Sequence, residues 1–193
     1  LIFSSGEKMF SSIDLIKKEL NYNELNKLKK PSEFFRRHNI KQKKINKLFE
    51  NFSKLRICVF GDLIIDEYIT CDTLGMSNEE PSLVVTPINK KKFIGGAGIV
   101  AAHASGLGAK VDFFTVLGKD KNNEYVKKKL REYKVSSKLF SDYSRPTTLK
   151  QRFRCAGKTL LKVSHLHQNS ISQNLQKKII NNFIKKIHTY DLI

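Results

Sequence analysis

The sequence has 193 residues, a length typical of one domain or of one domain with an appendage. Its 36 lysines and arginines against 18 aspartates and glutamates give a formal net charge of +18, and 40% of its residues are hydrophobic. This composition excludes a fully disordered chain. No apolar run approaches the roughly 20 residues of a transmembrane helix, so we expect no membrane as partner.

The first predicted elements are helical. Ser11 or Ser12 can cap a helix over residues 13–20. Residues 21–53 are rich in lysine, are interrupted at Pro31, and carry apolar residues at helical spacing. We therefore expect a basic helical linker over residues 21–53.

Half of the net charge lies in about a fifth of the chain. Residues 15–56 contain 13 bases and 4 acids, so their net charge is 13 − 4 = +9. A basic module that binds RNA or another polyanion is therefore one alternative. Lysine predominates over arginine, however, which favours a solvated surface, and we do not expect nucleic acid as the partner.

From residue 55 onward, strand and helix patterns alternate. The predicted strands cover residues 56–60, 68–70, 83–87, 111–117, 135–141, 147–155 and 159–166, and another begins at 191–193. The predicted helices cover residues 95–105, 122–133 and 173–188. This alternation predicts an α/β fold with a mainly parallel sheet. The short strands that lack helices between them predict a small accessory sheet.

Two aspartates follow the first predicted strand directly. Asp62 and Asp66 stand where an open α/β sheet binds ligands, beyond the carboxyl end of a strand. A carboxylate at this position can accept hydrogen bonds from the hydroxyl groups of a polyol. The alternative is a structural role, with Asp62 in a turn and Asp66 solvated.

A glycine-rich segment opens the first helix of this region. Gly95–Gly98 would let a ligand approach the backbone, and the N–H groups of a helix start favour oxyanions. Gly96-x-Gly98-x-x-Ala101 also matches a dinucleotide fingerprint, so an NAD(P)-type Rossmann domain is a second alternative. That fingerprint should follow the first strand of its unit, whereas here it follows a later, lysine-rich segment.

Several motifs occur in a characteristic order. They are Gly61-Asp62-x-x-x-Asp66, Met76–Pro81 with Val84-Val85, Gly95-Gly96-Ala97, Leu107-Gly108-Ala109, Leu117-Gly118-x-Asp120 and Pro146–Arg152. As an ordered set they resemble the PfkB (ribokinase-like) carbohydrate kinase family, and most closely the kinase domain of bifunctional heptose 7-phosphate kinase/nucleotidyltransferase proteins. The resemblance covers about residues 54–193. It implies a ribokinase-like, mainly parallel sheet flanked by helices, with a small β lid over the sugar.

This resemblance implies an ATP-dependent kinase for a sugar or sugar phosphate, such as heptose 7-phosphate, with ATP and Mg²⁺ as cofactors. In the family, the aspartate at the position of Asp66 binds sugar hydroxyls, and the diglycine at Gly95-Gly96 lies against the substrate. The family's Gly-Ala-Gly-Asp signature, which carries the general base, does not occur here. We therefore expect the base and most nucleotide contacts beyond Ile193, and an inactive fragment. Ile99 replaces an asparagine common in the family, so the sugar stays unidentified.

Two cations complete the predicted site. Lys150 and Arg152 alternate along one predicted strand and so face the same side. They can grip a substrate phosphate, Arg152 as a bidentate fork and Lys150 as a point charge; an exposed lid face is the alternative. The predicted substrate-binding residues are thus Asp62, Asp66, Gly95, Gly96, Lys150 and Arg152.

Neither a metal site nor a disulfide framework is expected. His165 and His167 lie two residues apart without a second pair of ligands, which does not suit zinc. The three cysteines include no C-x-x-C pair, and their odd number argues for a reducing compartment, the cytoplasm.

The ends of the chain suggest a longer protein. It begins with Leu1 instead of Met and ends on Leu192-Ile193, so we expect a fragment. Residues 1–20 resemble the closing segment of cytidylyltransferase-like nucleotidyltransferase domains, which implies a nucleotidyltransferase–linker–kinase fusion. A homodimer formed through the lid is the protein partner that we consider.

Overall fold

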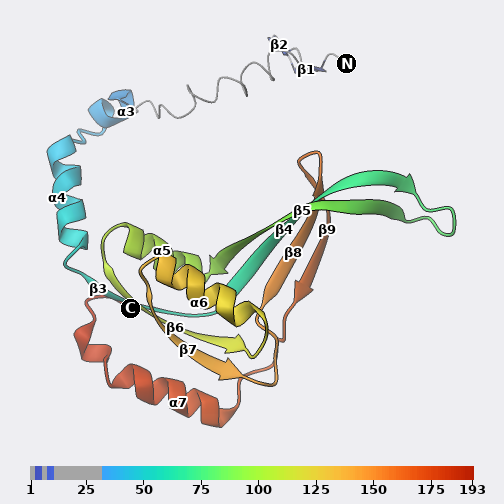
Figure 1. Cartoon of the computed structure of the whole chain (residues 1–193). Coiled ribbons are helices and arrows are strands. Elements are labelled where there is room, and N and C mark those ends of the chain that lie inside the picture. Colours follow the sequence, from blue (N-terminus) through green and yellow to red (C-terminus); the bar gives the residue numbers. More distant parts are fainter. Residues whose placement is uncertain (1–2, 6–7, 11–31) are drawn as a thin grey trace. The chain divides into compact units, whose positions relative to one another are not determined.

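A computed structural model describes residues 3–5, 8–10 and 32–193 (Figure 1). The chain divides into two compact units, residues 1–45 and residues 46–193. The second unit contains every residue predicted to bind substrate. No helix in the described part of the chain combines the length and the apolar character that crossing a membrane requires.

The amino-terminal unit consists of short elements. They are β1 (Phe3–Ser5), β2 (Lys8–Phe10) and α3 (Ser32–Arg37), while α4 (Gln42–Phe52) runs across the boundary into the second unit. Strands β1 and β2 pair antiparallel, a hairpin that the sequence pattern did not predict. Helices α3 and α4 lie in the described part of the predicted linker. The helix predicted over residues 13–20 lies outside the described residues.

A parallel sheet forms the centre of the second unit. Its strands are β3 (Arg56–Phe60), β6 (Lys110–Gly118) and β7 (Ser136–Asp142), in the order β3-β6-β7. On the other side of β3, Leu192 forms a single parallel bridge with Ile57, where the sequence predicted the start of a strand. The apolar run in β6 is the pattern of a parallel strand that is covered on both faces.

Helices cover both faces of this sheet (Figure 1). Helices α5 (Ala97–Gly106) and α6 (Asn122–Glu132) lie on one face, and α7 (Gln173–Ile184) lies on the other. Successive side chains of β6 alternate between the faces. Phe113 therefore packs in the core beneath α5 and α6, and Phe114 packs in the core beneath α7.

The accessory sheet is mixed and has the strand order β5-β4-β8-β9; we call it the lid sheet. Its strands are β4 (Leu63–Met76), β5 (Leu83–Gly96), β8 (Leu149–Cys155) and β9 (Lys158–His165). Strand β4 pairs antiparallel with β5 and parallel with β8, and β8 pairs antiparallel with β9. The prediction that these four segments form one small sheet is confirmed.

Three elements differ from the prediction in length. Strands β4 and β5 are 14 residues each, much longer than the short strands predicted over 68–70 and 83–87. Residues of β4 alternate between buried and less buried positions, but Ile64, which stands between two buried apolar residues, hides this period of two in the sequence. The helix predicted over 173–188 ends at Ile184 and is followed by a 3₁₀ turn, η1 (Ile187–Thr189).

Candidate sugar-binding site

The site is built on one face of the lid sheet, which we call the front face. It carries Ile64, Asp66, Tyr68 and Thr70 of β4, because alternate residues of a strand face the same side. The register places Lys150 beside Asp66 and Arg152 beside Tyr68. The cations predicted to share one side of β8 therefore share it with Asp66.

Gly95 lies directly against Asp66. A Cβ atom at Gly95 would overlap the carboxylate of Asp66. The next residue, Gly96, has a φ of 57°, and a Cβ atom there would overlap the backbone oxygen of Asp62. That oxygen accepts a hydrogen bond from the N–H of Ala97 at 2.9 Å. The diglycine thus lets two chain segments approach closely, as only residues without a side chain can.

Arg152 forms an ion pair with the carboxylate of Asp66. The hydrogen bond that Arg152 donates to Asp66 raises the pKa of Arg152 above its ordinary value. The Arg152 guanidinium also lies 5.2 Å from the ring centroid of Tyr68, and Arg154 lies 5.9 Å from the same ring. Arg152 therefore balances the charge of Asp66 and is placed to exchange that contact for one with a ligand.

Two cavities flank this ion pair. The larger, about 700 Å³, extends outward along the lid sheet and is lined by Asp66, Tyr68, Thr70, Asn89, Lys91, Phe93, Arg154, Ala156 and Gly157. The smaller, about 350 Å³, includes Asp62 and Lys150 in its lining. Three of the six predicted residues line these cavities: Asp66 lines the outer one, and Asp62 and Lys150 line the inner one.

The aromatic wall of the outer cavity was not among the predicted site residues. The rings of Tyr68 and Phe93 meet edge to face, with centroids 5.7 Å apart. Tyr68 follows Asp66 by two residues, so the period of two in β4 was the available signal. Phe93 lies beside Asp66 on β5, a cross-strand pairing that only the register reveals.

The opposite face of the lid sheet supports the site. There the carboxylate of Glu67, a residue only 6% exposed, accepts a hydrogen bond from the Gln151 amide at 2.5 Å. The amine of Lys92 lies 3.6 Å from the same carboxylate. Glu67, Gln151 and Lys92 each adjoin front-face residues in sequence, so this network fixes the strands that carry Asp66 and Arg152.

No metal ligand or nucleophile emerges from the described residues. Among them, no group of three or more histidine, cysteine, aspartate or glutamate side chains could hold a metal ion, so none is assigned to Mg²⁺. His165 instead shares a hydrogen bond with Gln151 at 2.9 Å. Burial, and secondly the charge of Asp112, raise the pKa of Cys58 to about 11, so its thiol is protonated at neutral pH.

Comparisons with known proteins identify the family of the chain. The family model described as pfkB family carbohydrate kinase matches residues 54–182. The chain is 34% identical over 142 residues to a bifunctional protein HldE of a Nitratiruptor species, a match that covers 72% of this chain and 30% of that protein. It is 33% identical over 114 residues to a D-beta-D-heptose 7-phosphate kinase of Bordetella bronchiseptica, covering 59% of this chain and 36% of that one.

Solved structures give the same fold. A carbohydrate kinase from Agrobacterium tumefaciens superposes with a TM-score of 0.55 at 19% identity, over 72% of this chain and 44% of that one. The chain thus spans about a third of the length of the curated relatives described above. Because the family model matches more than half of the residues, the chain belongs to the pfkB family of carbohydrate kinases.

Proposed function

We propose that this chain supplies the sugar-binding part of an ATP-dependent carbohydrate kinase. The observation that carries the proposal is the contact between the Asp66 carboxylate and Gly95, beside a cavity of about 700 Å³. A carboxylate there can accept hydrogen bonds from two neighbouring sugar hydroxyls. The diglycine lets the backbone of β5 lie directly against this carboxylate.

Substrate binding would exchange one partner of Asp66 for another. In the unliganded site, Arg152 neutralises the carboxylate. When a sugar hydroxyl donates a hydrogen bond to the Asp66 carboxylate, it replaces the contact with Arg152. The Arg152 guanidinium can then bind an anionic group of the substrate. ATP would supply the γ-phosphoryl group, and Mg²⁺ would neutralise its charge. The general base is expected outside these 193 residues, so the chain alone should show no turnover.

The substrate we propose is a sugar phosphate, with heptose 7-phosphate as the first candidate. The relative from Bordetella bronchiseptica bears that substrate in its name. Four cations lie on or beside the front face: Lys91, Lys150, Arg152 and Arg154. They suit a ligand that carries a phosphate as well as hydroxyls.

The organisation of the protein follows the same family resemblance. We propose that residues 54–193 begin the kinase domain, that 21–53 form a linker, and that 1–20 close a nucleotidyltransferase-like domain. A homodimer through the lid is supported by exposed apolar side chains at the outer half of the β4–β5 hairpin. These are Leu74, Met76, Leu83, Val84 and Ile88.

The test is Asp66→Asn in the protein encoded by the complete reading frame, assayed by ADP release with heptose 7-phosphate. Removing a charge-assisted hydrogen bond should lower kcat/KM by about 10- to 100-fold. Asp72→Asn is the matched control, because Asp72 lies exposed on the same strand, six residues further along. If Asp66→Asn and Asp72→Asn have the same kinetics as the wild type, Asp66 does not bind the sugar.

A further inference from the structure

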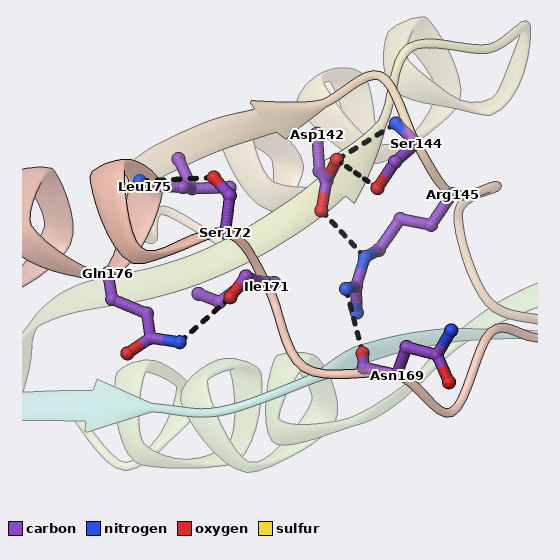
Figure 2. A network of polar contacts seen from close by, with 8 residues as sticks. All are labelled: Asp142, Ser144, Arg145, Asn169, Ile171, Ser172, Leu175 and Gln176. Carbon is purple, nitrogen blue, oxygen red and sulfur yellow. Dashed lines mark hydrogen bonds and ion pairs between the residues drawn. The ribbon is translucent and has the colours of Figure 1, made fainter.

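Arg145 is a cation that was not among the predicted site residues and that two hydrogen bonds hold in place. It lies between β7 and β8, just past the carboxyl end of β7. Its Nε donates a hydrogen bond to the Asp142 carboxylate at 2.7 Å, and its Nη2 donates to the backbone oxygen of Asn169 at 2.8 Å (Figure 2). A guanidinium has five N–H donors. Three of them therefore have no partner among the described residues.

The acidic partner of Arg145 is itself held in place. Asp142 accepts hydrogen bonds from the backbone N–H of Ser144 at 2.9 Å and from its hydroxyl at 2.7 Å. The hydrogen bonds from Ser144, followed by the contact with Arg145, keep the pKa of Asp142 below its ordinary value. Because the Arg145 side chain is only 17% exposed, this ion pair restricts it to one orientation.

The second partner of Arg145 is anchored through the start of α7. Close to Asn169, the backbone oxygen of Ile171 accepts a hydrogen bond from the Gln176 amide at 2.8 Å. Ser172 caps α7 by accepting from the N–H of Leu175 at 3.3 Å (Figure 2). The segment that carries the Asn169 carbonyl is thus tied to a helix.

The backbone around Arg145 is equally constrained. A Cβ atom at Gly118 would overlap the backbone oxygen of Arg145, so this segment crosses the end of β6 at close range. Two residues further on, the N–H of Thr147 donates to the carboxylate of Asp120 at 2.7 Å. Arg145 is therefore held both at its backbone and at its guanidinium.

Arg145 faces the inner cavity of about 350 Å³. The polar side chains of its lining include Asp62, Arg145, Thr148, Lys150 and His167. Among the described residues, no carboxylate oxygen lies within 4 Å of the Lys150 amine. The cavity also lies where the parallel strands β3 and β7 end, the edge at which α/β sheets bind ligands.

We propose that the inner cavity binds a phosphate group, with Arg145 as a bidentate donor and Lys150 as the second cation. A guanidinium already held in place loses little freedom when it binds an oxyanion. The Thr148 hydroxyl can add a donor, and Asp62, the one carboxylate of the lining, suits a hydroxyl of the same ligand. The source of the phosphate, a sugar ester or the terminal phosphate of a nucleotide, rests on the proposed kinase function.

The experiment measures binding of inorganic phosphate to the 193-residue chain by NMR titration. Arg145→Gln and Lys150→Gln should each weaken phosphate binding by about tenfold, the size expected for one charge-assisted hydrogen bond. Arg131→Gln is the control, because it removes the same charge from an exposed position on α6. If Arg145→Gln fails to fold, Lys150→Gln decides, since Lys150 has no ion pair to lose among the described residues. Phosphate affinity equal to that of the wild type in Lys150→Gln overturns the proposal.

Two further arms, measured on the protein encoded by the complete reading frame, identify the source of the phosphate. If it is a sugar ester, Lys150→Gln weakens heptose 7-phosphate binding but leaves unphosphorylated heptose unchanged. If it belongs to the nucleotide, the variant weakens a non-hydrolysable ATP analogue and leaves ADP unchanged. Binding of inorganic phosphate without any sugar or nucleotide binding would uphold the anion site and contradict the kinase function. If Arg145→Gln and Lys150→Gln both bind all these ligands as the wild type does, the anion site is contradicted and the kinase function is not.

Discussion

Asp66 and Glu67 are consecutive carboxylates that face opposite sides of the lid sheet. Asp66 lines a cavity and forms an ion pair with Arg152, whose side chain is long and flexible. Glu67 is buried and bonded to Gln151 and Lys92 on neighbouring strands. The period of two in a strand thus separates a carboxylate available to a ligand from one that holds the sheet together.

Gly95→Ala tests the close approach at the site. The added methyl group would overlap the Asp66 carboxylate, so we expect sugar binding to weaken by at least about tenfold, a cost of roughly 1.4 kcal/mol. Calorimetric titration with heptose 7-phosphate measures the affinity. Gly106→Ala is the control, because a Cβ atom at Gly106 meets nothing within 4 Å. Equal affinities for the two variants would show that the diglycine does not shape the site.

Asp142 makes a prediction for the pH dependence of stability. Hydrogen bonds from Ser144, then the contact with Arg145, lower its pKa in the folded state. A carboxyl group of this kind stabilises the fold above its unfolded pKa of about 3.9, and the contribution is lost as the pH falls through the folded pKa. Urea unfolding from pH 7 to pH 3 should therefore show a steeper acid loss in the wild type than in Asp142→Asn. If the two proteins lose the same stability as the pH falls, the ionised Asp142 does not stabilise the fold.

At the scale of elements, the lid sheet packs into the core of the second unit through Leu63 and Ile65 of β4 and Ile94 of β5. Ile69 is 1% exposed, whereas Ile88 on the neighbouring strand β5 is 59% exposed. Ile69→Ala should lower the free energy of unfolding by about 2–5 kcal/mol, because it leaves a cavity. Ile88→Ala should change it by less than about 0.5 kcal/mol. Urea unfolding measures both, and similar losses in the two variants would mean that the lid sheet is not packed as described.

The elements that the sequence predicts well are those with a strong period. Helix α6 and strand β6 follow the predicted ranges within one or two residues. The full length of β4 was not predictable in this way. Its outer half, beyond Cys71, is exposed, so no burial pattern marks it in the sequence. The β1–β2 hairpin likewise consists of two three-residue strands, too short to carry a period.

For the whole molecule, the order of motifs predicted the family and the fold, since those depend on residues spread along the chain. The contacts of the site depend on register, which the sequence does not reveal. Arg152 could be assigned to the lid face, but its ion pair with Asp66 requires the parallel pairing of β4 with β8. Arg145 reads as a turn residue until Asp142 and Asn169 are brought beside it.

The most direct test of the central claim is a ¹⁵N NMR titration of the 193-residue chain with heptose 7-phosphate. If the front face of the lid sheet binds the sugar, the largest shifts occur at the amides of Asp66, Gly95 and Gly96, and they disappear in Asp66→Asn. Shifts confined to the basic residues 32–54, or seen only with a dinucleotide at Gly96–Ala101, would contradict the sugar site and support one of the two alternatives instead.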